Sequence, residues 1–288
     1  MKSRVLVTGA NGQLGKTIRE LSSDFKHSID FVFVEKSELD ITSSESLELF
    51  FQASNFDYCI NCAAFTNVDL AETETEKAIN VNANAVKNLA INCKKQDIIL
   101  IHVSTDYVFD GKKKLPYIES DATNPINFYG ESKLLGEEYI REYLDHYFII
   151  RTSWLYSRFN KNFVKTVFNK LKNNEKLTII TSQKGTPTSC NDLSYFMLFL
   201  ISDAIKIFGT YHFSAQGETT WYGLGMQISK YLNKNSNVTP LKNYPSKAQR
   251  PLYSVLNNNK AEELLQKPLK NWEDSVDEVI KGLSNKSH

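Results

Sequence analysis

The sequence predicts an α/β protein with a doubly wound parallel sheet and a second, smaller α/β lobe. Three observations favour this fold class. Short apolar runs alternate with stretches of helical periodicity through the first half of the chain. A glycine-rich turn follows the first apolar run directly. After about Arg151 this rhythm gives way to irregular elements that are punctuated by Pro and Gly, which indicates a separate lobe.

Five apolar runs are expected to form the strands of the sheet. They lie at residues 5–7, 31–34, 58–60, 98–103 and 147–150. Continuous apolar composition is typical of parallel strands that are buried on both faces. Residues 76–95 place apolar side chains near one face of a helix, so we expect this segment to cover the sheet. We expect residues 233–237 to form a loop and residues 283–288 to be frayed.

The charge balance gives no reason to expect a polyanionic partner. Lys and Arg number 34 against 33 Asp and Glu, for a net charge of +1. This near-neutrality argues against nucleic acid or an anionic membrane surface as a partner. The sequence has no apolar run of about 18 residues and no leader-like N-terminus, so we expect a soluble, cytoplasmic protein.

The cysteines are expected to be structural. Cys59 and Cys62 form a C-x-x-C pair, which is a weak indicator of redox or metal chemistry. No second pair and no paired His are present to complete a zinc site. We therefore predict thiols in the core of the protein and no bound metal.

Three glycines after the first predicted strand indicate a dinucleotide site. Gly9, Gly12 and Gly15 occur in V-L-V-T-G-A-N-G-Q-L-G, between an apolar run and a helical stretch. The first glycine allows a tight turn, the second lets a pyrophosphate approach, and the third lets the helix pack closely on the sheet. The N-terminus of that helix offers free N–H groups to the phosphates. This context makes the predicted sheet Rossmann-like.

An acidic residue after the second predicted strand bears on which dinucleotide binds. Glu35 lies 20 residues beyond Gly15. An acid at this point hydrogen-bonds the adenosine ribose and disfavours a 2′-phosphate, which favours NAD slightly. Lys36 could offset that preference. The sequence therefore predicts NADH or NADPH as the cofactor and leaves the choice between them open.

A Tyr and a Lys after the fourth predicted strand form the candidate catalytic pair. Tyr129 and Lys133 are four residues apart, so they lie on one face of a helix. The Lys133 ammonium is expected to lower the pKa of Tyr129 and to hold the nicotinamide ribose. Thr105 follows a parallel strand at its carboxyl end and would hold a substrate carbonyl while Tyr129 donates a proton. The chain has 14 Tyr, so the position in the fold, rather than the spacing alone, supports this assignment.

These motifs together resemble a known family. T-G-A-N-G-Q-L-G, S-T-D-Y-V-F-D-G and Y-G-E-S-K are similar to the extended short-chain dehydrogenase/reductase superfamily. Further blocks resemble, more narrowly, the dTDP-4-dehydrorhamnose reductase family. They include N-C-A-A-F-T-N-V-D-L-A-E, R-T-S-W-L-Y, G-T-P-T and R-P-L-Y-S-V-L, at residues 61–72, 151–156, 185–188 and 250–256. The resemblance covers nearly the whole chain.

The resemblance implies a set of site residues. The catalytic set would be Thr105, Tyr129 and Lys133. The cofactor would contact Tyr129 and Lys133 and also Gly9, Asn11, Gly12, Gln13, Leu14, Glu35, Asp40, Ile41, Ala63, Ala64 and Thr66. The substrate would contact Val68, Asp69, Asp106, Trp154, Thr188 and Arg250. A dinucleotide-binding domain would comprise residues 1–152 and 189–213, and a substrate-binding lobe would comprise residues 153–188 and 214–288.

The implied activity is reduction of the C4 ketone of dTDP-4-dehydro-6-deoxy-L-mannose to dTDP-L-rhamnose, for cell-surface polysaccharide synthesis. Ser157 stands where the family usually has Gly, and Ser182 where it usually has Asp. These departures leave open a reductase or epimerase of another dTDP- or UDP-linked keto-sugar. A non-catalytic, dinucleotide-binding regulatory subunit is a third alternative. The oligomeric state is open, with a homodimer as one option; some relatives bind magnesium at a dimer interface, but the sequence shows no matching acidic cluster.

Overall fold

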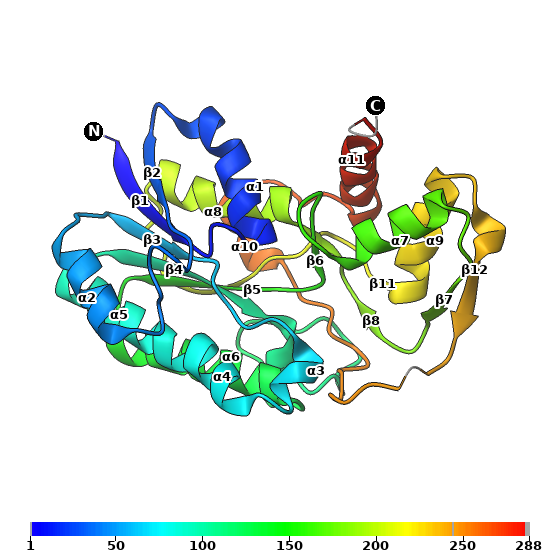
Figure 1. Cartoon of the computed structure of the whole chain (residues 1–288), viewed down its shortest axis with the longest axis horizontal. Helices are drawn as coiled ribbons and strands as arrows, with labels where there is room; N and C mark the ends of the chain where they lie inside the picture. The colour runs from blue at the N-terminus through cyan, green and yellow to red at the C-terminus, as the bar shows by residue number, and fades with distance from the viewer. Residues whose placement is uncertain (1, 244, 286–288) are drawn as a thin grey trace.

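A six-stranded sheet forms the larger lobe in the computed structural model, which describes residues 2–243 and 245–285 (Figure 1). All neighbouring strands in it are parallel. In spatial order they are β2 (Ile29–Phe33), β1 (Ser3–Thr8), β3 (Tyr58–Asn61), β4 (Ile99–Thr105), β5 (Tyr147–Thr152) and β10 (Gly209–His212). The chain order reverses between β1 and β3, and ligands bind at such a switch point in doubly wound sheets. The predicted fold class is confirmed.

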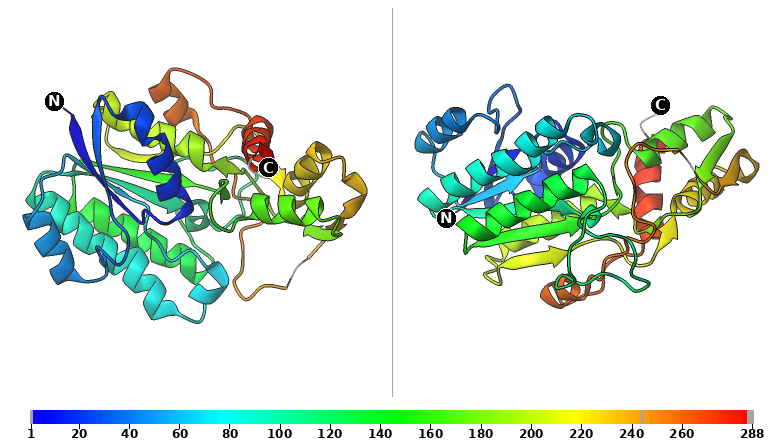
Figure 2. Two further views of the ribbon diagram at one scale, coloured as in Figure 1. Left: turned by 45° about the horizontal axis from the view of Figure 1, so that its top comes forward. Right: turned by 90° about the horizontal axis from the view of Figure 1, so that it is seen from below.

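Helices cover both faces of this sheet (Figures 1 and 2). One face carries α1 (Gln13–Leu21) and α8 (Cys190–Ser202), which pack on one another. The opposite face carries α2 (Ser44–Gln52), α5 (Ala85–Lys95) and α6 (Phe128–Tyr143). Separate apolar cores therefore lie above and below the strands, which explains why the strand sequences are apolar on both faces.

The predicted helix over residues 76–95 is present but is not a single α-helix. It comprises α4 (Thr75–Ile79), a π-helical turn η2 (Asn80–Asn84) and α5. The Asn82 side chain explains the interruption, because it leaves the helix to bond the backbone of Phe65, accepting from its N–H at 2.8 Å and donating to its carbonyl at 3.0 Å. Its amide also donates to Ser132 Oγ at 3.0 Å. The π-helical turn thus ties the loop after β3 to α6.

Two helical glycines give matched tests of packing. A Cβ at Gly136 of α6 would lie 2.2 Å from the carbonyl oxygen of Asn82, whereas nothing lies within 4 Å of a Cβ at Gly282. We expect Gly136→Ala to lower the free energy of unfolding by about 1–3 kcal/mol, the usual cost of overpacking. Gly282→Ala should raise it by roughly 0.5–1 kcal/mol, because alanine loses less backbone entropy in a helix. Urea denaturation of both variants checks this, and equal effects would contradict the close helix packing.

The smaller lobe lies beyond the carboxyl ends of the large sheet (Figure 1). Its helices α7, α9 and α11 share an apolar core. They span Phe163–Lys172, Trp221–Tyr231 and Trp272–Asn285. Three short strand pairs complete the lobe: β7 (Leu177–Ile180) with β12 (Val238–Leu241), β8 (Lys184–Gly185) with β11 (Thr219–Thr220), and β6 (Leu155–Tyr156) with β9 (Thr188–Ser189).

Shorter helical elements lie between these helices and strands along the chain. They are η1 (Ser22–Phe25), α3 (Val68–Ala71), η3 (Asp106–Val108), η4 (Asn235–Asn237) and α10 (Asn259–Leu265). The loop expected over residues 233–237 is present as the connection from α9 to β12, and its last three residues form the 3-10 turn η4. Helix α11 continues to Asn285, so fraying from residue 283 was wrong, and residues 286–288 lie outside the described residues. Within the described part of the chain, no helix is both long and apolar enough to cross a membrane.

Candidate functional site

The glycine turn between β1 and α1 leaves backbone space for an anion. Gly9 has a φ of +66°, and a Cβ there would lie 2.6 Å from the backbone nitrogen of Ala63. A Cβ at Gly15 would lie 2.6 Å from the carbonyl oxygen of Gly9. No side chain caps the N-terminus of α1 at Gly12, so its first N–H groups stay available to phosphate oxygens. The turn thus fits the pyrophosphate of a dinucleotide.

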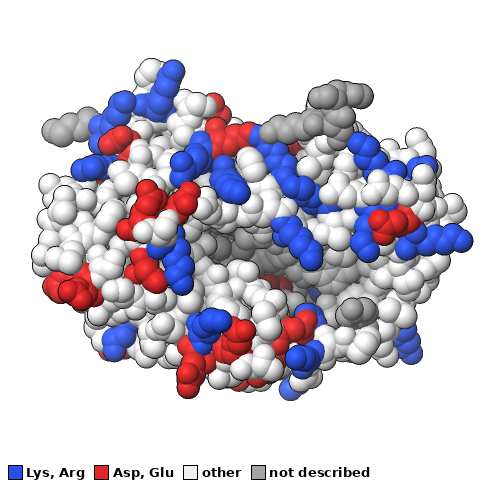
Figure 3. All heavy atoms as spheres, viewed as in Figure 1, with Lys and Arg blue, Asp and Glu red and all other residues white. Residues whose placement is uncertain are grey.

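A cavity of about 550 Å³ opens where this turn meets the carboxyl ends of β3, β4 and β5. Its floor comes from the large sheet and its far wall from the smaller lobe, including Lys161 and Trp221. Figure 3 shows the molecule hollowed between the two lobes, with Lys and Arg side chains gathered along the upper rim. The cavity is therefore placed where doubly wound sheets bind their ligands.

The predicted catalytic residues meet in this cavity. Thr105 ends β4, and Tyr129 and Lys133 lie on α6, which begins after an Asn127 cap. Burial raises the pKa of Tyr129 to about 12, while the neighbouring Thr105 hydroxyl opposes the shift. The expected lowering of this pKa by Lys133 was wrong for this structure, because desolvation of the phenol dominates.

Lys133 is held from below by the sheet. Its Nζ donates to the carbonyl of Val103 at 2.7 Å and lies 3.1 Å from Nε2 of His102. Only 2% of Lys133 is exposed. Burial lowers the pKa of Lys133 to about 8, against the opposing charge of Glu137. This lysine therefore changes charge near pH 8.

Asp106 adds a titratable carboxyl beside Thr105. The hydroxyl of Thr105 donates to its Oδ1 at 3.1 Å. Burial raises the pKa of Asp106 to about 7, although hydrogen bonds from Ser254 and Thr105 oppose the shift. A carboxyl that is partly protonated at neutral pH can donate a hydrogen bond to a sugar hydroxyl or accept one from it.

Trp154 lines the cavity from the smaller lobe in a constrained conformation. Its φ is +46°, which is unusual for a bulky residue. The ring stacks on Trp221 with centroids 3.8 Å apart, and the Trp221 indole N–H donates to Gln183 Oε1 at 3.0 Å. A Cβ at Gly185 would lie 2.7 Å from the ring, so only glycine lets it sit there. The expected contact of Trp154 with a sugar stays a prediction.

Most, but not all, of the predicted site residues line this cavity. Those that do are Gly12, Gln13, Leu14, Ala63, Ala64, Thr66, Val68, Thr105, Asp106, Tyr129, Lys133 and Trp154. Those that do not are Gly9, Asn11, Glu35, Asp40, Ile41, Asp69, Thr188 and Arg250. The second group lies along the glycine turn, after β2, in the Asp69–Arg250 pair, or, for Thr188, buried in β9.

Arg250 is engaged with another predicted substrate residue. Its Nη2 donates to Asp69 Oδ2 at 2.8 Å, and Asp69 also accepts from the backbone of Ala248. Burial would raise the pKa of Asp69, but Arg250 and this backbone bond hold it below its usual value. A phosphate on Arg250 would therefore have to share the guanidinium with Asp69. Thr188 is fully buried, and among the described residues no partner reaches its hydroxyl.

The adenine end of the predicted site is less enclosed. Asp40 Oδ1 accepts from the backbone and hydroxyl of Thr42, so it is already hydrogen-bonded. Ile41 is 6% exposed. The backbone N–H of Glu35 donates to Glu38, and the Glu35 side chain is partly exposed. Lys36 is 3.7 Å from Asp40 and 81% exposed, so it is free to turn toward a 2′-phosphate.

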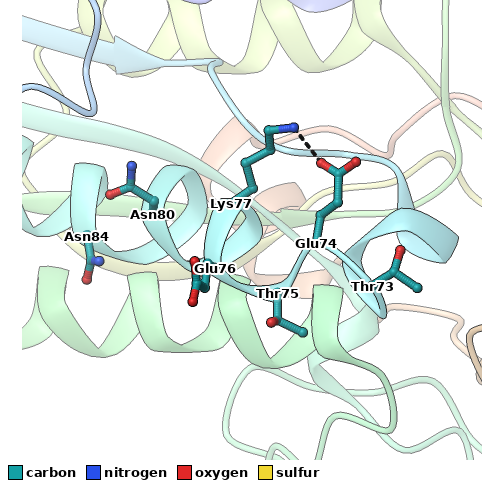
Figure 4. Close-up of a pocket in the computed structure, with 7 residues that line it drawn as sticks. All are labelled: Thr73, Glu74, Thr75, Glu76, Lys77, Asn80 and Asn84. Atoms are coloured by element: carbon teal, nitrogen blue, oxygen red, sulfur yellow. Dashed lines mark hydrogen bonds and ion pairs between the residues drawn. The ribbon is translucent and has the colours of Figure 1, made fainter.

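A second hollow, of about 730 Å³, lies on α4 and η2 (Figure 4). Its lining comes from one helical segment, and the Lys77 ammonium is already bound by Glu74 at 2.6 Å. The described residues that line it include none of the predicted site residues. Within residues 2–243 and 245–285, no three His, Cys, Asp or Glu side chains are grouped to hold a metal ion, and the four cysteines are free thiols.

Sequence reasoning missed three groups around the cavity. His102 contacts Lys133 and is bonded to Asn61; His102 interrupts the apolar run of β4 and Asn61 ends that of β3, which is the signal that could have revealed them. Trp221 covers one face of Trp154. Glu137, one turn beyond Lys133 on α6, is fully buried and paired with Arg151.

The fold and the cavity together define a nicotinamide-dinucleotide-dependent oxidoreductase of the short-chain dehydrogenase/reductase type. Residues 2–285 match the family model described as the RmlD substrate binding domain. The chain belongs to the dTDP-4-dehydrorhamnose reductase family.

Named relatives and solved structures support this placement over the full chain. The dTDP-4-dehydrorhamnose reductase of Escherichia coli is 33% identical, with 97% of each chain covered. The dTDP-4-keto-6-deoxy-D-glucose reductase of Streptomyces niveus is 32% identical, again over 97% of each chain. The crystal structure of the Bacillus anthracis dTDP-4-dehydrorhamnose reductase in complex with NADP has a TM-score of 0.93 and 36% identity, covering 98% of this chain and 100% of that one.

Proposed function

We propose that this protein reduces the C4 ketone of dTDP-4-dehydro-6-deoxy-L-mannose to give dTDP-L-rhamnose, with NADPH or NADH as the hydride donor. The observation that carries the proposal is the meeting of Thr105, Tyr129 and Lys133 with the glycine turn in one cavity. The names of the full-length relatives point to the same substrate.

The roles of the side chains follow from their positions. When bound, the reduced nicotinamide supplies the hydride. Tyr129 donates the proton to the ketone oxygen, because its raised pKa keeps the phenol protonated at neutral pH. Thr105 hydrogen-bonds the same oxygen and fixes its orientation. Lys133, in its ammonium form, holds the ribose of the dinucleotide.

We also propose that the two lobes divide the binding. Residues 1–152 and 189–213 would hold the dinucleotide, since they supply the sheet and the glycine turn. Residues 153–188 and 214–288 would hold the sugar nucleotide, with Trp154 against the sugar and Arg250 near a phosphate. Asp40 and Ile41 would flank the adenine beyond the cavity. The complex of the B. anthracis relative with NADP makes NADPH the first cofactor to test.

The test is a substrate panel. We expect oxidation of NADPH or NADH with dTDP-4-dehydro-6-deoxy-L-mannose, prepared with upstream enzymes, followed by absorbance. A preference of roughly tenfold or more for a UDP-linked keto-sugar would overturn the proposed substrate, since discrimination of that size reflects specific contacts. NADPH and NADH are compared in the same assay, which decides the role of Glu35 and Lys36.

A second candidate substrate is dTDP-4-keto-6-deoxy-D-glucose, which the S. niveus relative is named for. The segment that departs from the family favours testing it. Asn160 donates to the carbonyl of Asn11 at 2.8 Å, and Ser157 lies 3.4 Å from Gln13 Oε1, so this segment closes on the glycine turn. Product configuration, read by NMR, separates the two. Dinucleotide binding without oxidation by any keto-sugar would favour the regulatory subunit instead.

A further inference from the structure

A row of buried polar side chains crosses three strands beneath the cavity. Thr8 of β1, Asn61 of β3 and His102 of β4 are register neighbours, and each is at most 1% exposed. Thr8 Oγ1 lies 2.7 Å from Asn61 Oδ1, and Asn61 Nδ2 lies 3.1 Å from His102 Nδ1. His102 Nε2 then lies 3.1 Å from Lys133 Nζ. The row therefore links the end of β1 to the proposed catalytic lysine.

A backbone donor fixes the direction of the hydrogen bonds in this row. The N–H of Ala63 donates to Asn61 Oδ1 at 3.2 Å, and a backbone N–H can only donate. The amide oxygen of Asn61 therefore faces Ala63, and its NH₂ group faces His102. Since an NH₂ group is a donor only, His102 Nδ1 must accept.

The tautomer of His102 follows from this direction. Burial and the nearby Lys133 hold the pKa of His102 well below its usual value, so the ring is neutral. A neutral imidazole that accepts at Nδ1 carries its proton on Nε2. That Nε2–H points at the nitrogen of Lys133.

Whether the nitrogen of Lys133 can accept this N–H depends on the charge of the lysine. An ammonium has only donors, so it would place N–H against N–H, whereas a free amine accepts through its lone pair. The same nitrogen donates to Val103 O in either form. The charged neighbour is Glu137 on α6, which favours the ammonium, whereas burial raises the pKa of Cys62 after β3 and keeps its thiol neutral. Arg151 and Arg141 offset the charge of Glu137.

We propose that Asn61 and His102 are positioning residues that present an Nε2–H to Lys133, hold its nitrogen against Val103, and favour its free-amine form. The effect of this arrangement on catalysis rests on the proposed function, whereas the hydrogen-bond pattern itself does not. The consequence is a site that loses its ammonium at mildly alkaline pH. Activity that needs this ammonium falls as pH rises through that region.

Replacing Asn61 by Asp would reverse the direction of the hydrogen bonds from residue 61 through His102 to Lys133. The two side chains have nearly the same shape. A carboxylate only accepts, so His102 would donate to it from Nδ1 and turn Nε2 into an acceptor for a Lys133 ammonium. Ala63 N–H and Thr8 would still find an oxygen. The matched control is Asn67→Asp, because Asn67 is exposed, caps α3, and Asp caps equally well.

The first test reads the tautomer directly. In long-range ¹H–¹⁵N spectra of histidine-labelled protein, His102 is assigned by the loss of its signals in His102→Asn. We expect the Nε2–H tautomer in the natural protein and the Nδ1–H tautomer in Asn61→Asp. A natural protein with the proton on Nδ1, or with an imidazolium, overturns the proposal. This readout needs no substrate, so it stands even if the proposed function fails.

The second test reads the charge of Lys133 through the pH profile of kcat/KM. The alkaline limb, expected near pH 8, should move upward by roughly one pH unit in Asn61→Asp, since an added acceptor favours the ammonium. It should stay in place in Asn67→Asp. A uniform loss of activity with an unmoved limb would show a purely structural role and overturn the proposal. If Asn61→Asp does not fold, His102→Asn decides, because it keeps an acceptor for Asn61 but withdraws the N–H from Lys133.

Discussion

Replacement of Tyr129 by Phe is expected to lower kcat by about 10²–10⁴-fold, the usual contribution of a general acid. The phenol lies in the cavity beside Thr105, and its pKa of about 12 keeps its proton in place at neutral pH. Phe retains the edge-to-face contact with Tyr107, whose ring centroid is 5.8 Å away. The variant should therefore fold, keep the other dinucleotide contacts and lose the proton donor.

The control for this variant is Tyr139→Phe. Tyr139 lies on the same helix but contacts Lys87 on the outer side of the helix pair instead of lining the cavity. The Tyr139→Phe variant also loses a phenol hydroxyl, and we expect the turnover of this variant to be unchanged. Steady-state rates and fluorescence titration with NADPH on both variants separate chemistry from binding. Undiminished turnover in Tyr129→Phe would show that another group, such as Asp106, donates the proton.

The sequence was sufficient for the sheet and for the meeting of the central residues. Five apolar runs and the glycine spacing at Gly9 to Gly15 predicted five of the strands and the turn after the first, because periodicity and turn chemistry are local properties, whereas the order of the strands and the edge strand β10 were not predicted. The rule that ligands bind at the carboxyl ends of parallel strands then placed Thr105 and Tyr129 in one cavity.

What the sequence could not give depends on the environment of each group in three dimensions. The pKa of Tyr129 was expected to fall because of Lys133, but burial raises it, and burial of one phenol is not visible from residue spacing. Asp69 and Arg250 are 181 residues apart, so their ion pair could not be read from any local pattern. The π-helical turn at Asn82 likewise depends on a side-chain contact with the loop after β3.

A buried ion pair beneath the cavity supports the second large prediction. Glu137 is fully buried on α6, and Arg151 of β5 binds both its oxygens, with Nε at 2.9 Å from Oε1 and Nη2 at 2.7 Å from Oε2. Ser104 donates to Oε1 at 2.6 Å, and Arg141 reaches Oε2 from a more exposed position. Burial alone would raise the pKa of Glu137, but Arg151 lowers it below its usual value.

Arg151→Met is expected to lower the free energy of unfolding by about 3–5 kcal/mol, because it leaves a buried carboxylate without its main partner. Arg141→Met removes the other guanidinium, which is 35% exposed, and should cost only about 0.2–1 kcal/mol. Denaturant unfolding of both variants gives the comparison, and equal costs would contradict the assignment of Arg151 as the main partner.

The pH dependence of this cost gives a further check with a definite sign. In the natural protein the pair stabilises the fold fully above the ordinary Glu pKa of about 4.3, and this contribution is lost as pH falls through the lowered pKa of Glu137. In Arg151→Met burial dominates and raises that pKa, so Glu137 takes up a proton at a higher pH and becomes neutral. The difference in stability between the two proteins should therefore shrink as pH falls from 7 toward 5. A difference that stays constant over this range would mean that lost packing of the arginine side chain, rather than an uncompensated charge, causes the destabilisation.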